Sequence, residues 1–359
     1  MDCTDNWSKI KEIVQNTRFP AESNEIFLFG AGLIGALAAS TLKDEISLTA
    51  ICDNSTEKQG TMIEGLPCIS PAKLSQYQNP FVLISTNKYY KSVHQQLEDM
   101  KIPNCSLDTY VIHNHFHEFE EVFLSLDDES RAVYAGVLLG RMTGDMELIE
   151  QYCCDNQYFA LPKFRYLSDN NGVIINCGAY VGDTLEHFVE NSLGSFRRIY
   201  AFEPNETVFG ALQKRAELLK ELWALSDDQI ICEKKGVGHK IGFLPFRDVL
   251  RNLNASLTTI ETESKSRIEI ANLDQYLLQK DEGGVTFINA DIEGSEWDML
   301  HGAQETIQRH KPKLAISIYH NIFDFFRIQL YLKELVPEYQ FHIRHHSNTD
   351  VDTLLYCHI

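Results

Sequence analysis

Twice along the chain, a short apolar run passes directly into a glycine-rich turn that is followed by a helical pattern. The first unit spans residues 25–42 and the second spans residues 172–191. Short apolar runs bounded by turns are typical of strands buried on both faces, and such strands alternate with helices in parallel sheets. Two units of this kind in one chain predict two Rossmann-like α/β domains.

The chain has 359 residues, which is more than one ordinary core organises. We expect a Rossmann-like domain over residues 1–112, a helical connector over residues 113–165 and a second α/β domain over residues 166–359. The connector is distinguished by apolar residues at helical spacing, with Asp127 or Asp128 as a helix cap and Gly144 at the helix end. The first domain has predicted strands at residues 25–29, 47–52, 80–85 and 105–112, and predicted helices at residues 4–17 and 88–99.

The second domain repeats the alternation of strand and helix, but two consecutive strands close it. This order predicts a mostly parallel sheet of seven strands with a closing antiparallel strand. The strands are predicted at residues 172–177, 198–203, 229–233, 284–290, 313–319, 339–345 and 353–358, and the helices at residues 181–191, 205–222, 273–280, 295–309 and 324–336.

The composition excludes several classes of partner and location. The formal net charge is −19, and such a surface repels phosphate backbones, so nucleic acid is not an expected partner. There is no run of eighteen apolar residues for a membrane span, and residues 1–15 lack the pattern of a secretory signal. The nine cysteines form no C-x-x-C pair and are expected to be reduced thiols. We therefore expect a cytoplasmic protein.

The second glycine turn has the features of a ligand site. A buried strand runs into Gly178-x-x-x-Gly182, and a helix follows. Glycines let the backbone approach a ligand, and the helix start offers unpaired N–H groups to an anionic group. Glu203 follows Gly182 by 21 residues, at the end of the next predicted strand, where a carboxylate can accept hydrogen bonds from ribose hydroxyls. The alternative is a tight turn in a domain without ligand.

Residues 157–359 resemble the FkbM family of methyltransferases. The matching segments occur in order: QYF (157–159), INCGAYVGDT (175–184), YAFEPN (200–205), LDQYL (273–277), FINADIEGSEWDMLHGA (287–303), LAISIYH (314–320), FHIRHHS (341–347) and DTLLYC (352–357). The resemblance implies a class I methyltransferase fold with S-adenosylmethionine as the methyl donor. It also implies O-methylation, commonly of sugar or natural-product hydroxyls.

The resemblance further implies roles for residues around the turn. The methionine end of the donor would be lined by Gly178, Tyr180, Gly182 and Asp183, the ribose would be held by Glu203, and the adenine side would be shaped by Pro204 and Asn205. Two positions depart from the family pattern. Asn176 stands where an acidic residue is common, and its side chain can still accept a hydrogen bond, although it carries no charge. Asn289 stands where a lysine is common.

Candidate catalytic residues follow two later strands of the same sheet. Asp291 and Glu293 follow the strand that ends at residue 290, and His320 follows the strand at residues 313–319. Ligands in such sheets lie outside the carboxyl ends of the strands, so these side chains are expected to converge on one cleft. His320 is the first candidate for a general base because an unperturbed imidazole titrates near neutrality, and Asp291 is the second. Alternatively, the two carboxylates cap the next helix and His320 is structural. The spacing matches no specific metal pattern, so we predict no metal.

Two groups of histidines are weaker candidates. His113, His115 and His117 alternate as on a strand edge, and His342, His345 and His346 cluster with Arg344 near the C-terminus. Metal binding is the less favoured interpretation of both groups. If the last two strands form a hairpin, Arg344 and His346 face the mouth of the cleft and could contact an anionic acceptor.

The first glycine turn reads Gly30-x-Gly32-x-x-Gly35, with Asp53 eighteen residues later. This is the dinucleotide fingerprint, but the domain is small for a complete dinucleotide fold. Residues 25–100 resemble the nucleotide-sugar-binding subdomain of sugar acyltransferases. Three interpretations stay open: a nucleotide or nucleotide-sugar site, an NAD site, and a docking or dimerisation module without ligand.

These features together predict a methyltransferase that moves a methyl group from S-adenosylmethionine to a hydroxyl of a small molecule or saccharide. The alternative of another class is a non-catalytic nucleotide- or nucleotide-sugar-binding protein whose methyltransferase fold has decayed, which Asn176 and Asn289 favour. An NAD-dependent oxidoreductase that uses the first turn is a further alternative. The sequence leaves open the acceptor, O- against N- or C-methylation, and whether the chain forms a homo-oligomer.

Overall fold

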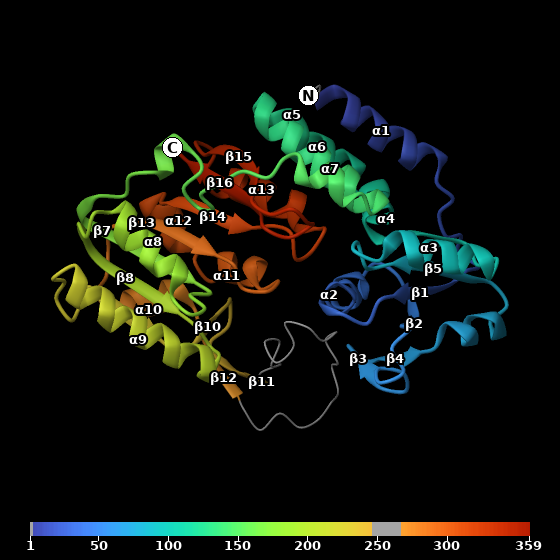
Figure 1. Ribbon diagram of the computed structural model, residues 1–359, viewed down its shortest axis with the longest axis horizontal. Helices are drawn as coiled ribbons and strands as arrows, with labels where there is room; N and C mark the ends of the chain where they lie inside the picture. Colours follow the sequence, from blue (N-terminus) through green and yellow to red (C-terminus); the bar gives the residue numbers. More distant parts are fainter. Residues whose placement is uncertain (1–2, 246–266) are drawn as a thin grey trace.

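The computed structural model describes residues 3–245 and 267–359. Two α/β domains lie side by side, and a group of helices connects them at one edge (Figure 1). Each domain is built on its own mostly parallel sheet, as the two strand–turn–helix units predicted. The domain boundaries expected at residues 112 and 165 stay predictions.

The N-terminal sheet has six strands in the order β3-β4-β2-β1-β5-β6. Its two central strands are buried on both faces, which explains their continuous apolar sequences. All neighbours pair in parallel except β3 and β4, a short hairpin that the sequence analysis did not find. The strands are β1 (Glu25–Phe29), β2 (Leu48–Cys52), β3 (Met62–Ile63), β4 (Leu66–Ile69), β5 (Pro80–Ile84) and β6 (Asn104–Ser106), with α2 (Leu33–Leu42), the 3-10 helix η1 (Pro71–Gln76) and α3 (Tyr90–Asp99) between them.

The connector is helical, and its first helix corrects one prediction. The strand expected at residues 105–112 stops at Ser106, because the Ser106 side chain accepts a hydrogen bond from the backbone N–H of Thr109 and caps a helix there. His113, His115 and His117 therefore lie on or between helices and not on a strand edge. The helices are α4 (Leu107–Asn114), α5 (Phe116–Ser125), α6 (Asp128–Thr143) and α7 (Met146–Glu150), and α1 (Cys3–Asn16) packs along α6.

Helix α6 begins and ends at the residues that the sequence predicted. The Asp127 carboxylate accepts a hydrogen bond from the backbone N–H of Ser130, and Gly144 ends the helix in the left-handed conformation with φ 64°. Inside α6, Gly136 and Gly140 permit close packing, since a Cβ on either residue would lie within 2.4 Å of Tyr152 or Ile149. This helix is therefore fixed tightly against its neighbours.

The C-terminal sheet has seven strands in the order β15-β16-β14-β13-β7-β8-β9. The five strands from β14 to β9 are parallel, and β16 is antiparallel to both β14 and β15. This is the predicted sheet of a class I methyltransferase fold. Its strands are β7 (Asp169–Cys177), β8 (Phe196–Phe202), β9 (Ile230–Glu233), β13 (Val285–Ala290), β14 (Lys313–Ser317), β15 (Gln340–His345) and β16 (Thr353–His358).

Helices cover both faces of this sheet, and a small three-stranded sheet lies at its edge (Figure 1). The helix expected at residues 295–309 is divided in two at Gly302. The helices are α8 (Asp183–Asn191), α9 (Glu206–Leu222), α10 (Leu273–Gln279), α11 (Glu296–His301), α12 (Gln304–His310) and α13 (Asp324–Leu335), and the short 3-10 helix η2 (Pro162–Phe164) precedes the sheet. The small sheet consists of β10 (Gly236–Val237), β11 (Gly242–Pro245) and β12 (Arg267–Ala271), and it was not predicted.

The two domains touch beside the carboxyl edge of the C-terminal sheet. Gly294, with φ 94°, packs against Leu37 of α2, and a Cβ at this glycine would lie 2.7 Å from the Leu37 side chain. Nearby, the Asn321 side chain donates a hydrogen bond of 2.9 Å to the Thr41 hydroxyl. The loop after β13 is therefore covered in part by the N-terminal domain.

A buried ion pair fixes the connector to the same edge. Arg141 of α6 pairs with Asp108 of α4 at 2.8 Å, and both side chains are 1% exposed. The same guanidinium donates to the backbone carbonyls of Tyr319 and Asp350, which belong to two loops of the C-terminal domain. Within residues 3–245 and 267–359, no helix is long and apolar enough to cross a membrane.

Candidate active site

The turn after β7 depends on two glycines with positive φ. Gly178 has φ 83° and Gly182 has φ 87°. A Cβ on Gly178 would lie 2.0 Å from the backbone oxygen of Asp291, so no other residue fits there without a backbone shift. Gly182 is the N-cap of α8, whose first turn leaves backbone N–H groups without helical partners. The predicted turn is therefore present, and it lies directly against the loop that carries Asp291.

Glu203 follows β8 and reaches back to this turn. Its carboxylate accepts hydrogen bonds from the backbone N–H of Tyr180 at 3.0 Å and from that of Asn205 at 2.8 Å. Burial raises the pKa of Glu203, while the two backbone donors act against this shift. Asn205 in turn caps α9 through the backbone N–H groups of Thr207 and Val208. The glycine turn and the predicted ribose-binding carboxylate are thus adjacent.

A polar groove of about 600 Å³ begins at the start of α8. It is lined on one side by Asp183, Thr184 and His187 and on the other by residues 156–159 and 165–166. Asp183 belongs both to this groove and to the predicted donor site. The sequence analysis matched residues 157–159 to the family but assigned them no role.

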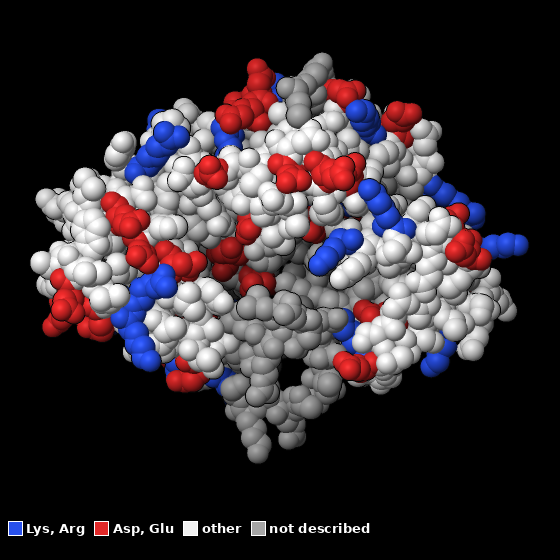
Figure 2. Space-filling model, viewed as in Figure 1, with Lys and Arg blue, Asp and Glu red and all other residues white. Residues whose placement is uncertain are grey.

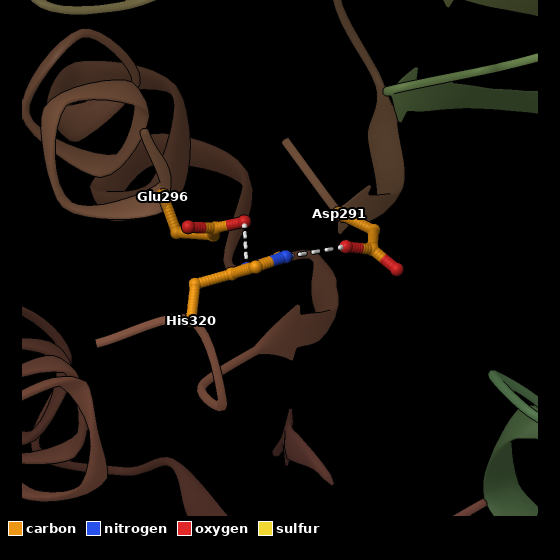
Figure 3. A group of neighbouring side chains, drawn as sticks. All are labelled: Asp291, Glu296 and His320. Atoms are coloured by element: carbon orange, nitrogen blue, oxygen red, sulfur yellow. Dashed lines mark ion pairs between the residues drawn. The ribbon is translucent and has the colours of Figure 1, made fainter. Parts of the chain in front are cut away.

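Asp291, Glu293 and His320 converge as predicted. The Nε2 atom of His320 lies 3.6 Å from an oxygen of Asp291 and 3.5 Å from an oxygen of Glu293. A third carboxylate, that of Glu296, lies 3.1 Å from Nδ1 on the other side of the ring. Figure 3 shows the imidazole between the carboxylates of Asp291 and Glu296. In Figure 2 acidic side chains gather in a hollow between the two domains.

Glu296 is the residue of this cluster that the sequence analysis missed. It occupies the first turn of α11, where an acidic residue is expected for electrostatic reasons alone. Its side chain turns back, accepts a hydrogen bond of 2.8 Å from the backbone N–H of Ile292 and is fully buried. The N-cap of α11 is Ser295, without a side-chain cap. The pattern Asp291-x-Glu293-x-x-Glu296 was the available signal.

The carboxylates change the protonation of the histidine. Burial lowers the pKa of His320, but Glu296, Glu293 and Asp291 together raise it well above its usual value. Burial also raises the pKa of Asp291 to about 7, although His320 opposes this shift, and His320 lowers the pKa of Glu293. In this arrangement the imidazole carries a proton and serves as the counter-charge of the carboxylates. The expectation of a free imidazole that titrates near neutrality does not hold here.

The two departures from the family pattern are partners in the structure. Asn176 on β7 and Asn289 on β13 lie opposite each other, and the Asn289 side chain donates a hydrogen bond of 3.1 Å to that of Asn176. Both side chains are fully buried. An acidic residue and a lysine at these positions would form a buried ion pair, so this chain has a neutral pair in its place.

The first glycine turn has a similar local arrangement. The Asp53 carboxylate accepts hydrogen bonds from the backbone N–H of Ala31 at 2.7 Å and from that of Ser55 at 2.8 Å. The buried Lys58 ammonium lies 3.5 Å from the same carboxylate. Gly35 packs on the turn itself, since a Cβ there would lie 1.8 Å from the backbone oxygen of Gly30. The turn and Asp53 are together, and Gly32 is the N-cap of α2.

Arg344 and His346 do not lie as expected. Arg344 is 7% exposed and binds Ser130 and Glu129 at the start of α6. His346 makes its contacts with the backbone oxygen of Cys154 at 2.9 Å and with the Tyr356 hydroxyl at 2.8 Å. The guanidinium group of Arg344, which was expected to contact an anionic acceptor, thus binds the connector.

Two separate segments of the chain match known protein families. Residues 22–106 match the family described as C2185-like, N-terminal. Residues 176–343 match the methyltransferase FkbM domain, which includes the glycine turn, Glu203 and the cluster around His320. No curated protein gives a significant match to the chain.

One solved structure shows the same fold over nearly the whole chain. Methyltransferase FkbM from Methylobacillus flagellatus KT is 22% identical with a TM-score of 0.59, over 99% of this chain and 98% of that protein. An rRNA methylase from Streptococcus thermophilus is 14% identical with a TM-score of 0.32, over 53% of this chain and 87% of its own. Spermidine synthase from Thermotoga maritima is 13% identical with a TM-score of 0.32, over 59% of each chain. At the two lower scores the likeness carries no conclusion for this chain. Residues 176–343 thus match the methyltransferase FkbM domain, and the C-terminal domain has the class I methyltransferase fold.

Proposed function

We propose that this protein transfers a methyl group from S-adenosylmethionine to a hydroxyl of a small molecule or saccharide. The observation that carries the proposal is the contact between Gly178 and the backbone oxygen of Asp291. Because of this contact, the turn that would hold the donor and the cluster that would meet the acceptor lie at one edge of the sheet.

The residues at the turn fit S-adenosylmethionine. Gly178 lets the turn approach the backbone of Asp291 closely, and the start of α8 offers N–H groups to the donor's carboxylate. Glu203 is buried and would accept hydrogen bonds from the ribose hydroxyls. The remaining groups at the site would be Tyr180 and Asp183 at the methionine end, Pro204 and Asn205 at the adenine side, and Asn176 behind the turn.

S-adenosylmethionine supplies a methyl group on a sulfonium, and the acceptor oxygen takes this methyl group and loses its proton as S-adenosylhomocysteine is released. The protein must therefore position the acceptor hydroxyl and receive its proton. We assign the proton acceptance to the Asp291 carboxylate, and the positioning of the acceptor to Glu293 and His320. Glu293 is half-exposed, so the cluster is open to an acceptor on its side.

Calorimetry with S-adenosylmethionine tests the donor, and release of S-adenosylhomocysteine in the presence of free and nucleotide-linked sugars tests the transfer. In the active reaction, Asp291→Asn is expected to lower kcat by about 10²–10⁴-fold, the usual contribution of a positioned acid or base. Glu221→Gln on the exposed side of α9 is the control and should leave kcat unchanged. Donor binding without any release across the panel would favour the non-catalytic alternative.

The ligand of the N-terminal domain stays a prediction. We propose a nucleotide or nucleotide-sugar at Gly30, Gly32, Gly35 and Asp53, supported by the glycine turn and its carboxylate. Calorimetry with UDP-glucose and NAD separates this proposal from the dinucleotide and ligand-free alternatives.

A further inference from the structure

The cluster around His320 has an excess of negative charge. Asp291, Glu293 and Glu296 surround one imidazole, and within the described ranges no lysine or arginine lies within ion-pair distance of these three carboxylates. Asp324 lies nearby but is occupied by Arg327 at 2.6 Å. Three carboxylates with one cation are costly to bury unless a further positive charge binds.

Several buried atoms of the cluster also have no hydrogen-bond partner. These are Nδ1 and Nε2 of His320, which is 4% exposed, and Oε2 of Glu296, which is fully buried. The ring therefore makes ion-pair contacts without well-aligned hydrogen bonds in the described part of the chain. Buried polar atoms in folded proteins are nearly always satisfied, and exceptions commonly mark the place of an ion or of catalysis.

The spacing of the ligand atoms fits a coordination shell. First-row metal ions bind histidine nitrogen and carboxylate oxygen at about 2.0–2.2 Å, so neighbouring ligands around one ion lie about 3.0–3.5 Å apart. The distances from His320 Nε2 to the oxygens of Asp291 and Glu293 are 3.6 Å and 3.5 Å. The potential ligand atoms that lie within 4.8 Å of one another belong to Asp291, Glu296 and His320, so the half-exposed Glu293 side chain would have to move to place its oxygen on the same ion.

Glu296 lies where a metal-binding histidine usually has a carboxylate partner for its second ring nitrogen. A histidine that binds a metal through one nitrogen usually donates the N–H of its other nitrogen to a carboxylate, which fixes the ring and its tautomer. The Glu296 oxygen that lies 3.1 Å from Nδ1 is the one held by the backbone N–H of Ile292. The carboxylate oxygen nearest to Nδ1 is thus fixed in place, and a small rotation of the ring would align the N–H with it.

We propose that Asp291, Glu293 and His320 bind a divalent first-row metal ion, with Glu296 orienting the histidine. The ion replaces the proton on Nε2 of His320, and this proton is released to the solvent. One nitrogen and two oxygen ligands suit Mn²⁺, Fe²⁺, Co²⁺ or Zn²⁺ better than Mg²⁺, which prefers oxygen alone. Binding of the ion does not depend on the proposed function, but its use does. In methyl transfer the ion would bind the acceptor hydroxyl and lower its pKa, and the proton would pass to the Asp291 oxygen that does not bind the ion.

Titration of the full-length, chelator-treated protein with Co²⁺ tests the site, because bound Co²⁺ absorbs visible light according to its ligands. One Co²⁺ per chain is expected, and Zn²⁺ should compete with it for the site. Glu293→Gln and Asp291→Asn should each weaken binding at least about tenfold, and Glu296→Gln by about 10–100-fold. Glu221→Gln should bind as the unchanged protein does.

Glu293 is half-exposed, so its variant keeps the test valid if replacement of a buried residue prevents folding. Absence of the visible band, or equal affinity in the unchanged protein and Glu293→Gln, would overturn the proposal. Calorimetry with S-adenosylmethionine on the same samples separates the two proposals. Donor binding without Co²⁺ binding contradicts only the metal site, and Co²⁺ binding without donor binding contradicts only the proposed function.

Discussion

The Asn289 side chain donates a hydrogen bond of 3.1 Å to Asn176, from the strand beside it. The family pattern places a lysine and an acidic residue at these two positions. The two departures compensate each other in part, because one hydrogen bond joins the side chains and no charge is buried. Nδ2 of Asn176 and Oδ1 of Asn289 have no hydrogen-bond partner among the described residues. The two positions therefore differ from the family pattern together and contact each other in the structure.

This relationship predicts strong coupling between the two positions. Asn176→Asp alone buries an unpaired carboxylate and should lower the free energy of unfolding by about 3–5 kcal/mol. The double variant with Asn289→Lys should recover at least about 2 kcal/mol, since the lysine restores an ion pair. Urea unfolding of both single variants and the double variant at pH 7 measures this coupling, and additive losses would contradict it.

Gly178→Ala should disrupt the turn. The new Cβ would lie 2.0 Å from the backbone oxygen of Asp291, and φ at this position is 83°. We expect a loss of at least about 2 kcal/mol in the free energy of unfolding, together with loss of donor binding.

Gly210→Ala on α9 is the matched control, because its Cβ would meet no atom within 4 Å. Since alanine favours helix over glycine, this variant should be more stable by up to about 1 kcal/mol. Thermal unfolding and calorimetry distinguish the two variants. Equal behaviour of the two would show that the close approach at Gly178 is absent.

Glu203→Gln tests the ribose site. The amide keeps the shape of the side chain but loses the charge that strengthens hydrogen bonds to hydroxyls and backbone N–H groups. The dissociation constant for S-adenosylmethionine should rise by about 10–100-fold. The control is Glu206→Gln, an exposed residue in the first turn of α9. Unchanged affinity in Glu203→Gln would place the donor elsewhere.

The buried His345 side chain should make the free energy of unfolding depend on pH. Burial lowers the pKa of His345 to about 4, from about 6.5 in the unfolded chain. The folded state therefore favours the neutral ring, and the stability present above pH 6.5 is lost as the pH falls from about 6.5 to about 4.

The full effect of this shift is about 3 kcal/mol. Urea unfolding at several pH values measures it, and His345→Asn should remove this part of the dependence. A parallel loss of stability in the unchanged protein and the variant would assign the effect to other groups.

The arrangement of the C-terminal domain could be predicted because its strands are long, apolar and separated by clear turns. Glu203 and the cluster of Asp291, Glu293 and His320 could be placed because they follow strands of one parallel sheet. Glu296 could not, because an acidic residue in the first turn of a helix has an ordinary explanation. The charge state of His320 could not be predicted either, because it depends on three carboxylates that only the fold brings together.

Other failures arose where local pattern and tertiary contacts disagree. The run at residues 105–112 is apolar enough for a strand, but the Ser106 cap starts a helix within it. Arg344 was expected at the cleft because a hairpin presents alternate residues on one face. The position of α6, which binds this guanidinium through Ser130 and Glu129, could not be inferred from the hairpin itself.

The contact between Gly294 and Leu37 means that the N-terminal domain forms a wall beside the loop of Asp291 and Glu293. A chain shortened to the methyltransferase domain would expose this loop to water and free it to move. The two domains therefore pack against each other beside the candidate active site, and we expect the N-terminal domain to limit which acceptors reach Asp291 and Glu293.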